Sequence, residues 1–156
     1  METTVEMIGV TKRFGNVVAN DKVNFCCKVG HIHGLIGENG AGKTTLMKIL
    51  YGMHQLDEGE ILIRGEKVRL NSPKAAIRQG IGMVHQHFTL VPSLTVAQNI
   101  ILGRPPLKKS GTIDIKEAIA EVERMSRDYN LTVDPKSVVD DLPVGVRQRV
   151  EILKAL

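Results

Sequence analysis

A single glycine-rich stretch constrains this chain more than any other feature of its sequence. Residues 37–44 read Gly-Glu-Asn-Gly-Ala-Gly-Lys-Thr and fit the pattern G-x-x-x-x-G-K-[ST] at every fixed position. The mostly apolar run 31–36 before it is typical of a strand, and the apolar residues from Leu46 to Met53 after it recur at helical spacing. The sequence therefore predicts a strand, a glycine-rich turn and a helix. Its glycines do not follow the G-x-G-x-x-G spacing of dinucleotide folds.

The residue types of this stretch suit a polyphosphate ligand. Several backbone N–H donors must converge on a polyphosphate, and the glycines allow the backbone to come that close. A helix that begins near Lys43 directs unpaired N–H groups and the positive end of its dipole at the anion. Lys43 adds a charge for the outer phosphates, and Thr44 adds a hydroxyl for Mg²⁺. The predicted nucleotide-binding residues are Gly37, Asn39, Gly40, Ala41, Gly42, Lys43, Thr44 and Thr45.

Length and charge limit the classes of protein to which the chain belongs. A chain of 156 residues is long enough for one domain that buries roughly 68–70% of its unfolded surface. The net charge is +4, from 21 basic and 17 acidic residues without long runs of one sign, so no nucleic-acid partner is expected. No apolar run approaches the ~18–20 residues of a membrane span. Adjacent Cys26 and Cys27 are poor partners for a disulfide or a metal, which favours a reduced, cytosolic protein.

The rest of the sequence predicts strands followed by helices. Residues 4–10 and 17–29 read as two strands around a turn at Gly15-Asn16, so a hairpin precedes the glycine-rich loop. Ser72-Pro73 and Asp114 are typical of the starts of helices. Further strands are expected at 60–64, 67–70 and 81–84, and helices at 73–78, 95–102, 115–129 and from about 143 onward.

Two residues outside the loop are candidates for the same site. Phe14 lies just before the hairpin turn, where an exposed ring is able to stack on a base, and a ring that covers local core is the alternative. Gln86 follows the predicted strand 81–84, and ligands of open α/β sheets gather at the carboxyl ends of strands. Its amide is therefore a candidate for the metal and the attacking water, and an ordinary polar loop residue is the alternative. His85 and His87 flank it without a third ligand nearby, which argues against zinc.

Together these segments resemble the amino-terminal portion of the nucleotide-binding domain of ATP-binding-cassette (ABC) transporters, over essentially all 156 residues. The segment 84–96, Val-His-Gln-His-Phe-Thr-Leu-Val-Pro-Ser-Leu-Thr-Val, is most similar to the ATPase subunits of importers for nucleosides and simple sugars. The resemblance implies ATP and Mg²⁺ as ligands, with Phe14 stacked on adenine and Gln86 near Mg²⁺ and the transmembrane partner. It also implies an α/β P-loop NTPase fold with a mostly parallel central sheet, an antiparallel β hairpin part and a helical subdomain.

The signature motif of the resembled family, L-S-G-G-Q, corresponds here to Leu142-Pro143-Val144-Gly145-Val146. Three of the five positions differ, because Pro143 stands for the serine, Val144 for a glycine and Val146 for the glutamine. The resemblance therefore implies a signature that binds phosphate weakly and does not support catalysis.

The expected domain is a partial ABC ATP-binding domain over residues 1–156. Its nucleotide-binding core with the antiparallel β part is expected in 1–88, and the helical subdomain with the signature region in 89–150. No apolar strand that ends in Asp or Asp-Glu follows the last helix, so the chain looks truncated before the acidic Walker B region. We therefore expect these residues alone not to hydrolyse ATP.

The resemblance implies a transport ATPase, peripheral to the cytoplasmic face of the cell membrane. Its implied partners are transmembrane permease subunits, a second nucleotide-binding domain and, indirectly, a substrate-binding protein. Two alternatives stay open: a nucleotide-binding fragment without transport activity, and an ABC ATPase of chromosome maintenance or DNA repair. Long coiled-coil heptads between Gln86 and the signature would indicate the chromosome type, and the sequence has none there.

Overall fold

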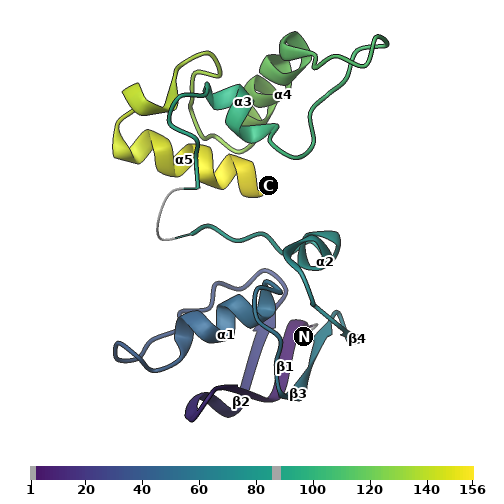
Figure 1. Ribbon diagram of the computed structural model, residues 1–156, viewed down its shortest axis with the longest axis vertical. Coiled ribbons are helices and arrows are strands. Elements are labelled where there is room, and N and C mark those ends of the chain that lie inside the picture. Colours follow the sequence, from purple (N-terminus) through teal and green to yellow (C-terminus); the bar gives the residue numbers. More distant parts are fainter. Residues whose placement is uncertain (1–2, 86–88) are drawn as a thin grey trace. The chain divides into compact units, whose positions relative to one another are not determined.

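The chain folds into two units, which meet in the sequence between Gly82 and Met83. The computed structural model describes residues 3–85 and 89–156. The described residues of the first unit, Met1–Gly82, form a β-sheet and two helices, and those of the second, Met83–Leu156, form three α-helices and one 3₁₀ turn (Figure 1). Each unit has its own apolar core.

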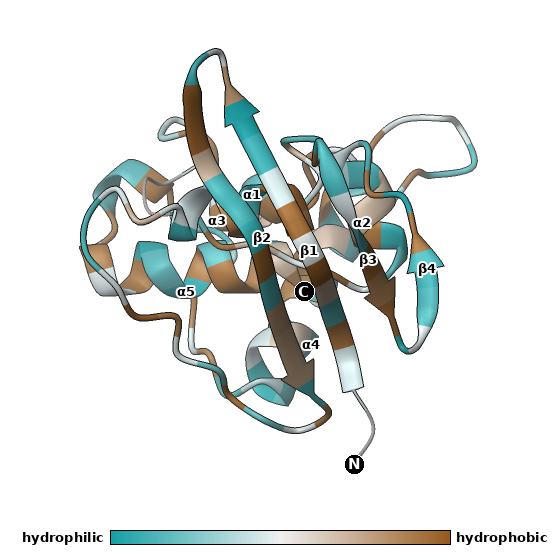
Figure 2. Cartoon of the chain, turned by 90° about the horizontal axis from the view of Figure 1, so that it is seen from below, coloured by the Kyte–Doolittle hydropathy of each residue, from teal (hydrophilic) through white to brown (hydrophobic). Residues whose placement is uncertain are grey.

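A long β hairpin begins the first unit, as the sequence predicts. Strands β1 (Thr3–Phe14) and β2 (Val17–Lys28) pair antiparallel, and the turn Gly15-Asn16 joins them. Strand β3 (Glu58–Ile63) pairs with the other side of β1, and β4 (Glu66–Val68) pairs with β3, which gives the order β2-β1-β3-β4. The edge strand β4 is mostly hydrophilic, which suits an edge that faces water (Figure 2).

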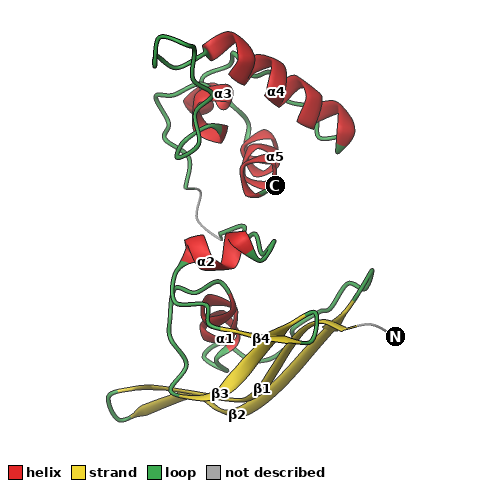
Figure 3. Cartoon of the chain, turned by 90° about the vertical axis from the view of Figure 1, so that its right-hand side faces the viewer, coloured by secondary structure: helices red, strands yellow, loops and turns green. Residues whose placement is uncertain are grey.

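Helix α1 (Lys43–Leu50) packs on one face of this sheet (Figure 3). Leu46 and Ile49 are three residues apart, so both lie on the helix face that is buried against the strands. Helix α2 (Pro73–Arg78) begins where Ser72-Pro73 predicts, because the Ser72 side chain accepts a hydrogen bond from the N–H of Ala75 at 3.3 Å. The buried core of the first unit consists of Met7, Val10, Leu46, Ile49, Ile61, Ile63, Leu70 and Ala76.

Local capping signals define the helices of the second unit. Thr95 and Gln98 form a reciprocal capping box before α3 (Val96–Ile100). The Asp114 carboxylate accepts from two N–H groups of the first turn of α4 (Ile115–Asp128), as predicted. A 3₁₀ turn, η1 (Val139–Asp141), precedes α5 (Val144–Ala155). The buried core consists of Leu90, Val96, Ala97, Val122, Val139 and Val150.

One buried amide organises the loop that enters α3. The Asn99 side chain is fully buried, and its oxygen accepts from the Val91 N–H at 2.7 Å. Its nitrogen donates to the carbonyls of Val91, Leu94 and Thr95 at 3.0–3.3 Å.

Within residues 3–85 and 89–156, no helix has both the length and the apolar character that a crossing of the bilayer requires.

The α/β class, with an antiparallel β part and a helical part, is confirmed, but two predicted strands are wrong. Residues 31–38 and 81–85 adopt no regular secondary structure, and every ladder between the described strands is antiparallel. The predicted parallel central sheet is therefore not formed by the described residues. A strand needs a neighbour for its N–H and C=O groups, and Ile32 and Ile36 are 101% and 96% exposed instead of buried between neighbours.

Candidate functional site

The glycine-rich loop leads directly into helix α1, and two of its glycines have left-handed backbone conformations. Gly40 has φ 86°, and Gly42, the N-cap residue of α1, has φ 81°. A β-carbon on Gly42 would lie 2.2 Å from the Ala19 carbonyl oxygen and 2.8 Å from the Asn20 side-chain nitrogen. Gly42 is therefore required both by its conformation and by its close contact with strand β2.

Helix α1 presents an N-terminus that its own side chains do not neutralise. Its N-cap is a glycine without a side-chain hydrogen bond, and its first turn, which starts with Lys43-Thr44-Thr45, contains no acidic residue. The N–H groups of the first turn and the positive end of the helix dipole thus face the loop without a carboxylate. This arrangement favours an anionic ligand.

Lys43 spans the loop that precedes it. Its ammonium donates to the carbonyl oxygens of Gly37 and Glu38, each at 2.7 Å. The Ala41 N–H donates to the Glu38 carbonyl at 3.2 Å and closes a turn inside the loop. The Lys43 ammonium is thereby held over the loop. Phosphate oxygens of a bound ligand would replace the two carbonyl oxygens as its hydrogen-bond partners.

Asn20 on β2 holds the end of the loop through a hydrogen bond, and this contact was not predicted from the sequence. Its side chain is 5% exposed and donates through Nδ2 to the Gly42 carbonyl at 3.3 Å. Gly42 is thus held by β2 through a hydrogen bond as well as through its contact with Ala19. No local signal marks Asn20, because its partner lies 22 residues further along the chain.

Phe14 lies at the end of β1, opposite Val17 of β2. Phe14 is 44% exposed, and the His54 ring meets its ring edge-on with 5.2 Å between the centroids. The Lys12 ammonium lies 5.4 Å from the centroid of the Phe14 ring. Because β2 carries both the partner of Phe14 and the contact to Gly42, the hairpin brings the predicted aromatic and the loop to the same part of the first unit.

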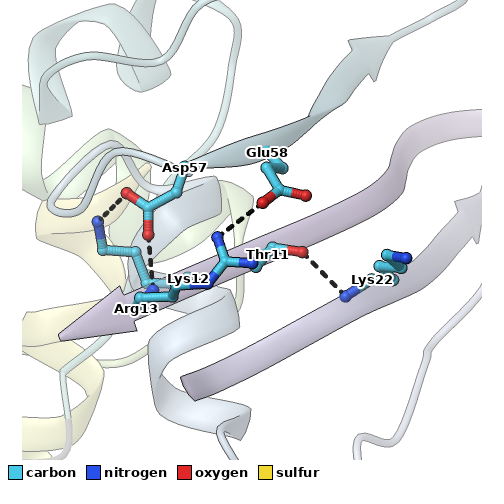
Figure 4. Close-up of polar contacts among 6 residues, drawn as sticks. All are labelled: Thr11, Lys12, Arg13, Lys22, Asp57 and Glu58. Atoms are coloured by element: carbon cyan, nitrogen blue, oxygen red, sulfur yellow. Dashed lines mark hydrogen bonds and ion pairs between the residues drawn. The ribbon is translucent and has the colours of Figure 1, made fainter. Parts of the chain in front are cut away.

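The strand end that carries Phe14 is held by acidic residues just before and within β3 (Figure 4). The Asp57 carboxylate accepts from the Arg13 N–H at 2.6 Å and from the Lys12 ammonium at 2.9 Å. These hydrogen bonds, the Arg13 N–H first, lower the pKa of Asp57 below its ordinary value. Glu58 pairs with the Arg13 guanidinium at 2.7 Å, which raises the pKa of Arg13.

The altered signature lies at the start of α5 in the second unit. Pro143 is the N-cap residue, without a side-chain hydrogen bond, and its carbonyl accepts from the N–H groups of Val146 and Arg147 at 2.9 and 3.0 Å. Val144 is 61% exposed, and Leu142 packs against the core of the unit. The segment is thus a helix N-terminus with an exposed branched side chain.

Two further expectations concern metal ligands. Gln86 and His87 lie outside the described residues, so the role of Gln86 stays a prediction. Among residues 3–85 and 89–156, no three His, Cys, Asp or Glu side chains gather in a way that would hold a metal ion. Thr44, in the first turn of α1, is the described residue that the sequence assigns to Mg²⁺.

Comparison with known proteins identifies a family and several relatives that are similar to this chain. A family model described as "ABC transporter" matches residues 20–156. The guanosine import ATP-binding protein NupO of Bacillus subtilis (strain 168) is 54% identical over 156 residues, which are 100% of this chain and 30% of that protein. The nucleoside import ATP-binding protein NupA of Lactococcus lactis subsp. cremoris (strain MG1363) is 52% identical over 99% of this chain and 30% of that protein. This chain thus spans about 30% of the length of these relatives.

A solved structure has the same fold. The nucleotide-free ATP-binding cassette from an ABC transporter superposes with a TM-score of 0.81 at 21% sequence identity. The match covers 98% of this chain and 64% of that one.

Proposed function

The chain belongs to the ABC transporter family, and we propose on that premise that its glycine-rich loop and Phe14 bind Mg-ATP. The observation that carries the proposal is the uncapped N-terminus of α1, which follows two left-handed glycines and begins with Lys43. A helix N-terminus without a carboxylate, joined to a loop without β-carbons at Gly40 and Gly42, provides N–H donors and space for phosphate oxygens.

Each residue has a distinct part in this proposal. The backbone around Gly40 and Gly42 donates N–H groups to the phosphates, and the Lys43 ammonium leaves the carbonyls of Gly37 and Glu38 for phosphate oxygens. The Thr44 hydroxyl would be a ligand for Mg²⁺, and the ion would neutralise charge on the phosphates. The ring of Phe14, partly exposed, stacks on adenine. The predicted set is completed by Asn39 and Ala41, which lie in the loop, and by Thr45, which lies in the first turn of α1.

At the level of the whole protein we propose the ATPase subunit of an importer. The relatives at 54% and 52% identity are named for the import of guanosine and of nucleosides. These names favour nucleosides as the cargo, and simple sugars are the second candidate. Bound ATP would supply the free energy of transport through its hydrolysis. The proposed partners are permease subunits in the membrane, a second nucleotide-binding domain and a substrate-binding protein, with this subunit peripheral to the cytoplasmic face.

Residues 1–156 alone are proposed to bind ATP without turning it over above background. Phosphoryl transfer to water needs metal ligands and a group that orients the water. Thr44 and, by prediction, Gln86 are the candidates within this sequence for those tasks, and neither is acidic. Steady ATP turnover by a purified 156-residue chain, lost in Lys43→Ala, would contradict this part.

The binding proposal is tested by titrating Mg-ATP against the purified protein and two lysine variants. Lys43→Ala removes a charge-assisted contact, so its affinity for ATP should fall about tenfold to a hundredfold. Lys48→Ala is the matched control, because Lys48 lies in the last turn of the same helix, away from the loop. It should bind as the wild type does. Equal affinity of wild type and Lys43→Ala would show that the loop is not the site.

The transport proposal needs a separate measurement. Cells that lack the gene should take up radiolabelled guanosine more slowly, and the wild-type gene, but not the Lys43→Ala gene, should restore uptake. Restored uptake of ribose instead of guanosine would assign the subunit to sugars. Uptake of both that is unaffected by deletion would reject an import function.

A further inference from the structure

The ladder between β1 and β3 stops before it reaches Phe14. Its last pair is Thr11 with Glu58, after a register shift that begins at Ile8. From Lys12 to Phe14, strand β1 is paired with β2 alone. A strand end with one neighbour is held less firmly than the strand interior, and shifts of register change the direction in which its side chains point.

Asp57 takes the place of the missing ladder partner. Its Oδ2 accepts from the Arg13 N–H at 2.6 Å, as a carbonyl of β3 would if the ladder continued (Figure 4). Its own N–H donates to the Thr11 carbonyl at 2.9 Å. Asp57 thus binds β1 on both sides of Lys12, once through its backbone and once through its carboxylate.

The same carboxylate also fixes a side chain that touches Phe14. The Lys12 ammonium is 2.9 Å from Asp57 Oδ1 and 5.4 Å from the centroid of the Phe14 ring. The Lys12 side chain is 13% exposed and the Asp57 side chain 36% exposed, so the lysine end of this ion pair is mostly covered while the carboxylate is open to water on one side. His54, which meets the ring of Phe14 edge-on, lies three residues before Asp57 in the same connection between α1 and β3.

We propose that Asp57 is a positioning residue for the nucleotide base: it holds the end of β1 so that the exposed face of Phe14 is oriented for stacking. The inference rests on the proposed ATP site and adds a residue to it that does not touch the ligand. It also predicts that loss of Asp57 weakens binding of the base but not of the phosphates. The base stacks on Phe14, whereas the phosphates bind to the loop and α1.

The neighbouring carboxylate provides a matched comparison. Glu58 pairs with the guanidinium of Arg13 at 2.7 Å on an exposed surface and makes no side-chain contact to the backbone of β1 among the described residues. Removal of its charge therefore leaves the Arg13 N–H and the Lys12 ammonium with their partner Asp57. Glu58→Gln should not change the orientation of Phe14.

The test measures two ligands against four forms of the purified protein. The ligands are Mg-ATP and Mg-tripolyphosphate, which has phosphates but no base, and the proteins are wild type, Asp57→Ala, Asp57→Asn and Glu58→Gln. Asp57→Ala should weaken ATP about threefold to tenfold, a part of what stacking on an aromatic ring contributes, and leave tripolyphosphate unchanged. Asp57→Asn keeps an oxygen that accepts from the Arg13 N–H and should bind ATP more tightly than Asp57→Ala. Glu58→Gln should match wild type.

The outcomes separate this inference from the proposed function. Suppose that Lys43→Ala loses ATP affinity but Asp57→Ala does not. This result would overturn the positioning role of Asp57 and leave the ATP site standing. Equal weakening of both ligands in Asp57→Ala and Asp57→Asn would also overturn it, since the loop itself would then depend on Asp57. Failure of the wild type to bind either ligand would reject the ATP site and the inference with it.

Discussion

The Asn20 side chain donates a hydrogen bond to the Gly42 carbonyl at 3.3 Å, so a strand residue holds the N-cap of the helix that follows the loop. The Asn20 Nδ2 atom would be 2.8 Å from a β-carbon on Gly42. Such a contact is far shorter than van der Waals distance. The Ala19 carbonyl oxygen, a backbone atom, would lie even closer, at 2.2 Å, so the packing of α1 on β2 requires that residue 42 has no side chain.

Gly42→Ala should destabilise the protein and abolish nucleotide binding. A left-handed conformation costs a residue with a β-carbon about 1–2 kcal/mol, and overpacking against the Ala19 carbonyl adds about 1–3 kcal/mol. Gly40→Ala is the control, because Gly40 has a similar φ of 86° but no atom within 4 Å of its β-carbon position. Chemical denaturation of both variants measures the difference. Equal losses of stability would mean that the contact with β2 relaxes at little cost.

Glu151→Ala should destabilise the second unit. Glu151 is 3% exposed and accepts hydrogen bonds from the Thr89 N–H and, at 3.1–3.2 Å, from its hydroxyl. Removal of the carboxylate leaves the Thr89 N–H without this partner, which costs about 1–3 kcal/mol. Glu123→Ala, an exposed position on α4, is the control and should change stability by less than about 0.5 kcal/mol. Hydrogen exchange at the Thr89 amide should rise in Glu151→Ala alone.

Sequence patterns predicted the features of this fold whose causes are local. Ser72 caps α2 through a residue three positions away, and Asp114 caps α4 through residues two and three positions away. The hairpin turn at Gly15-Asn16 is equally local. Asn20, Asp57 and Glu151 were missed because their partners lie 22, 44 and 62 residues away, and no spacing in the sequence marks such pairs.

The two wrongly predicted strands share one physical cause, the lack of a neighbouring strand to pair with. The runs 31–36 and 81–84 have the apolar composition of buried strands, but composition does not supply a neighbouring strand. The loop that follows the first run nevertheless has its left-handed glycines and leads into α1. The geometry of the loop therefore depends on its own glycines and on β2 in this structure, and not on a paired strand before it.

The contribution of Asp57 to stability should depend on pH. Its pKa is lowered from the ordinary 3.8, first by the Arg13 N–H and then by the Lys12 ammonium. Since the folded form binds the proton less readily than the unfolded form, the stabilisation is complete above 3.8 and is lost as the pH falls through the lowered pKa. The pKa of Arg13 is raised by Glu58, so Arg13 keeps its charge in this range.

Thermal unfolding of wild type and Asp57→Ala across this pH range measures that contribution. The difference in Tm should be constant near neutral pH and should shrink in acid. Asp128→Asn, an exposed aspartate at the end of α4, serves as the control for the general effect of one carboxylate. A difference in Tm that persists unchanged in acid would show that the ionised carboxylate is not what holds the strand.

The last prediction concerns the altered signature at the start of α5. In the resembled family, the signature of one cassette faces the phosphates bound on another, and its serine and glycines donate hydrogen bonds to them. Pro143 has neither a hydroxyl nor an N–H, and the exposed side chain of Val144 narrows the approach to the helix N-terminus. We therefore expect the ATP site that this signature completes to be impaired.

Restoring the family residues should relieve that impairment. The triple variant Pro143→Ser, Val144→Gly, Val146→Gln should raise the rate of ATP turnover by the assembled full-length transporter, because each regained charge-assisted hydrogen bond contributes roughly 1.5–3 kcal/mol. Gln148→Ala, an exposed residue further along α5, is the control and should leave the rate unchanged. A triple variant that folds, binds ATP and turns it over no faster than the wild type, with both sites of the wild type equally active, would show that the altered signature is no handicap.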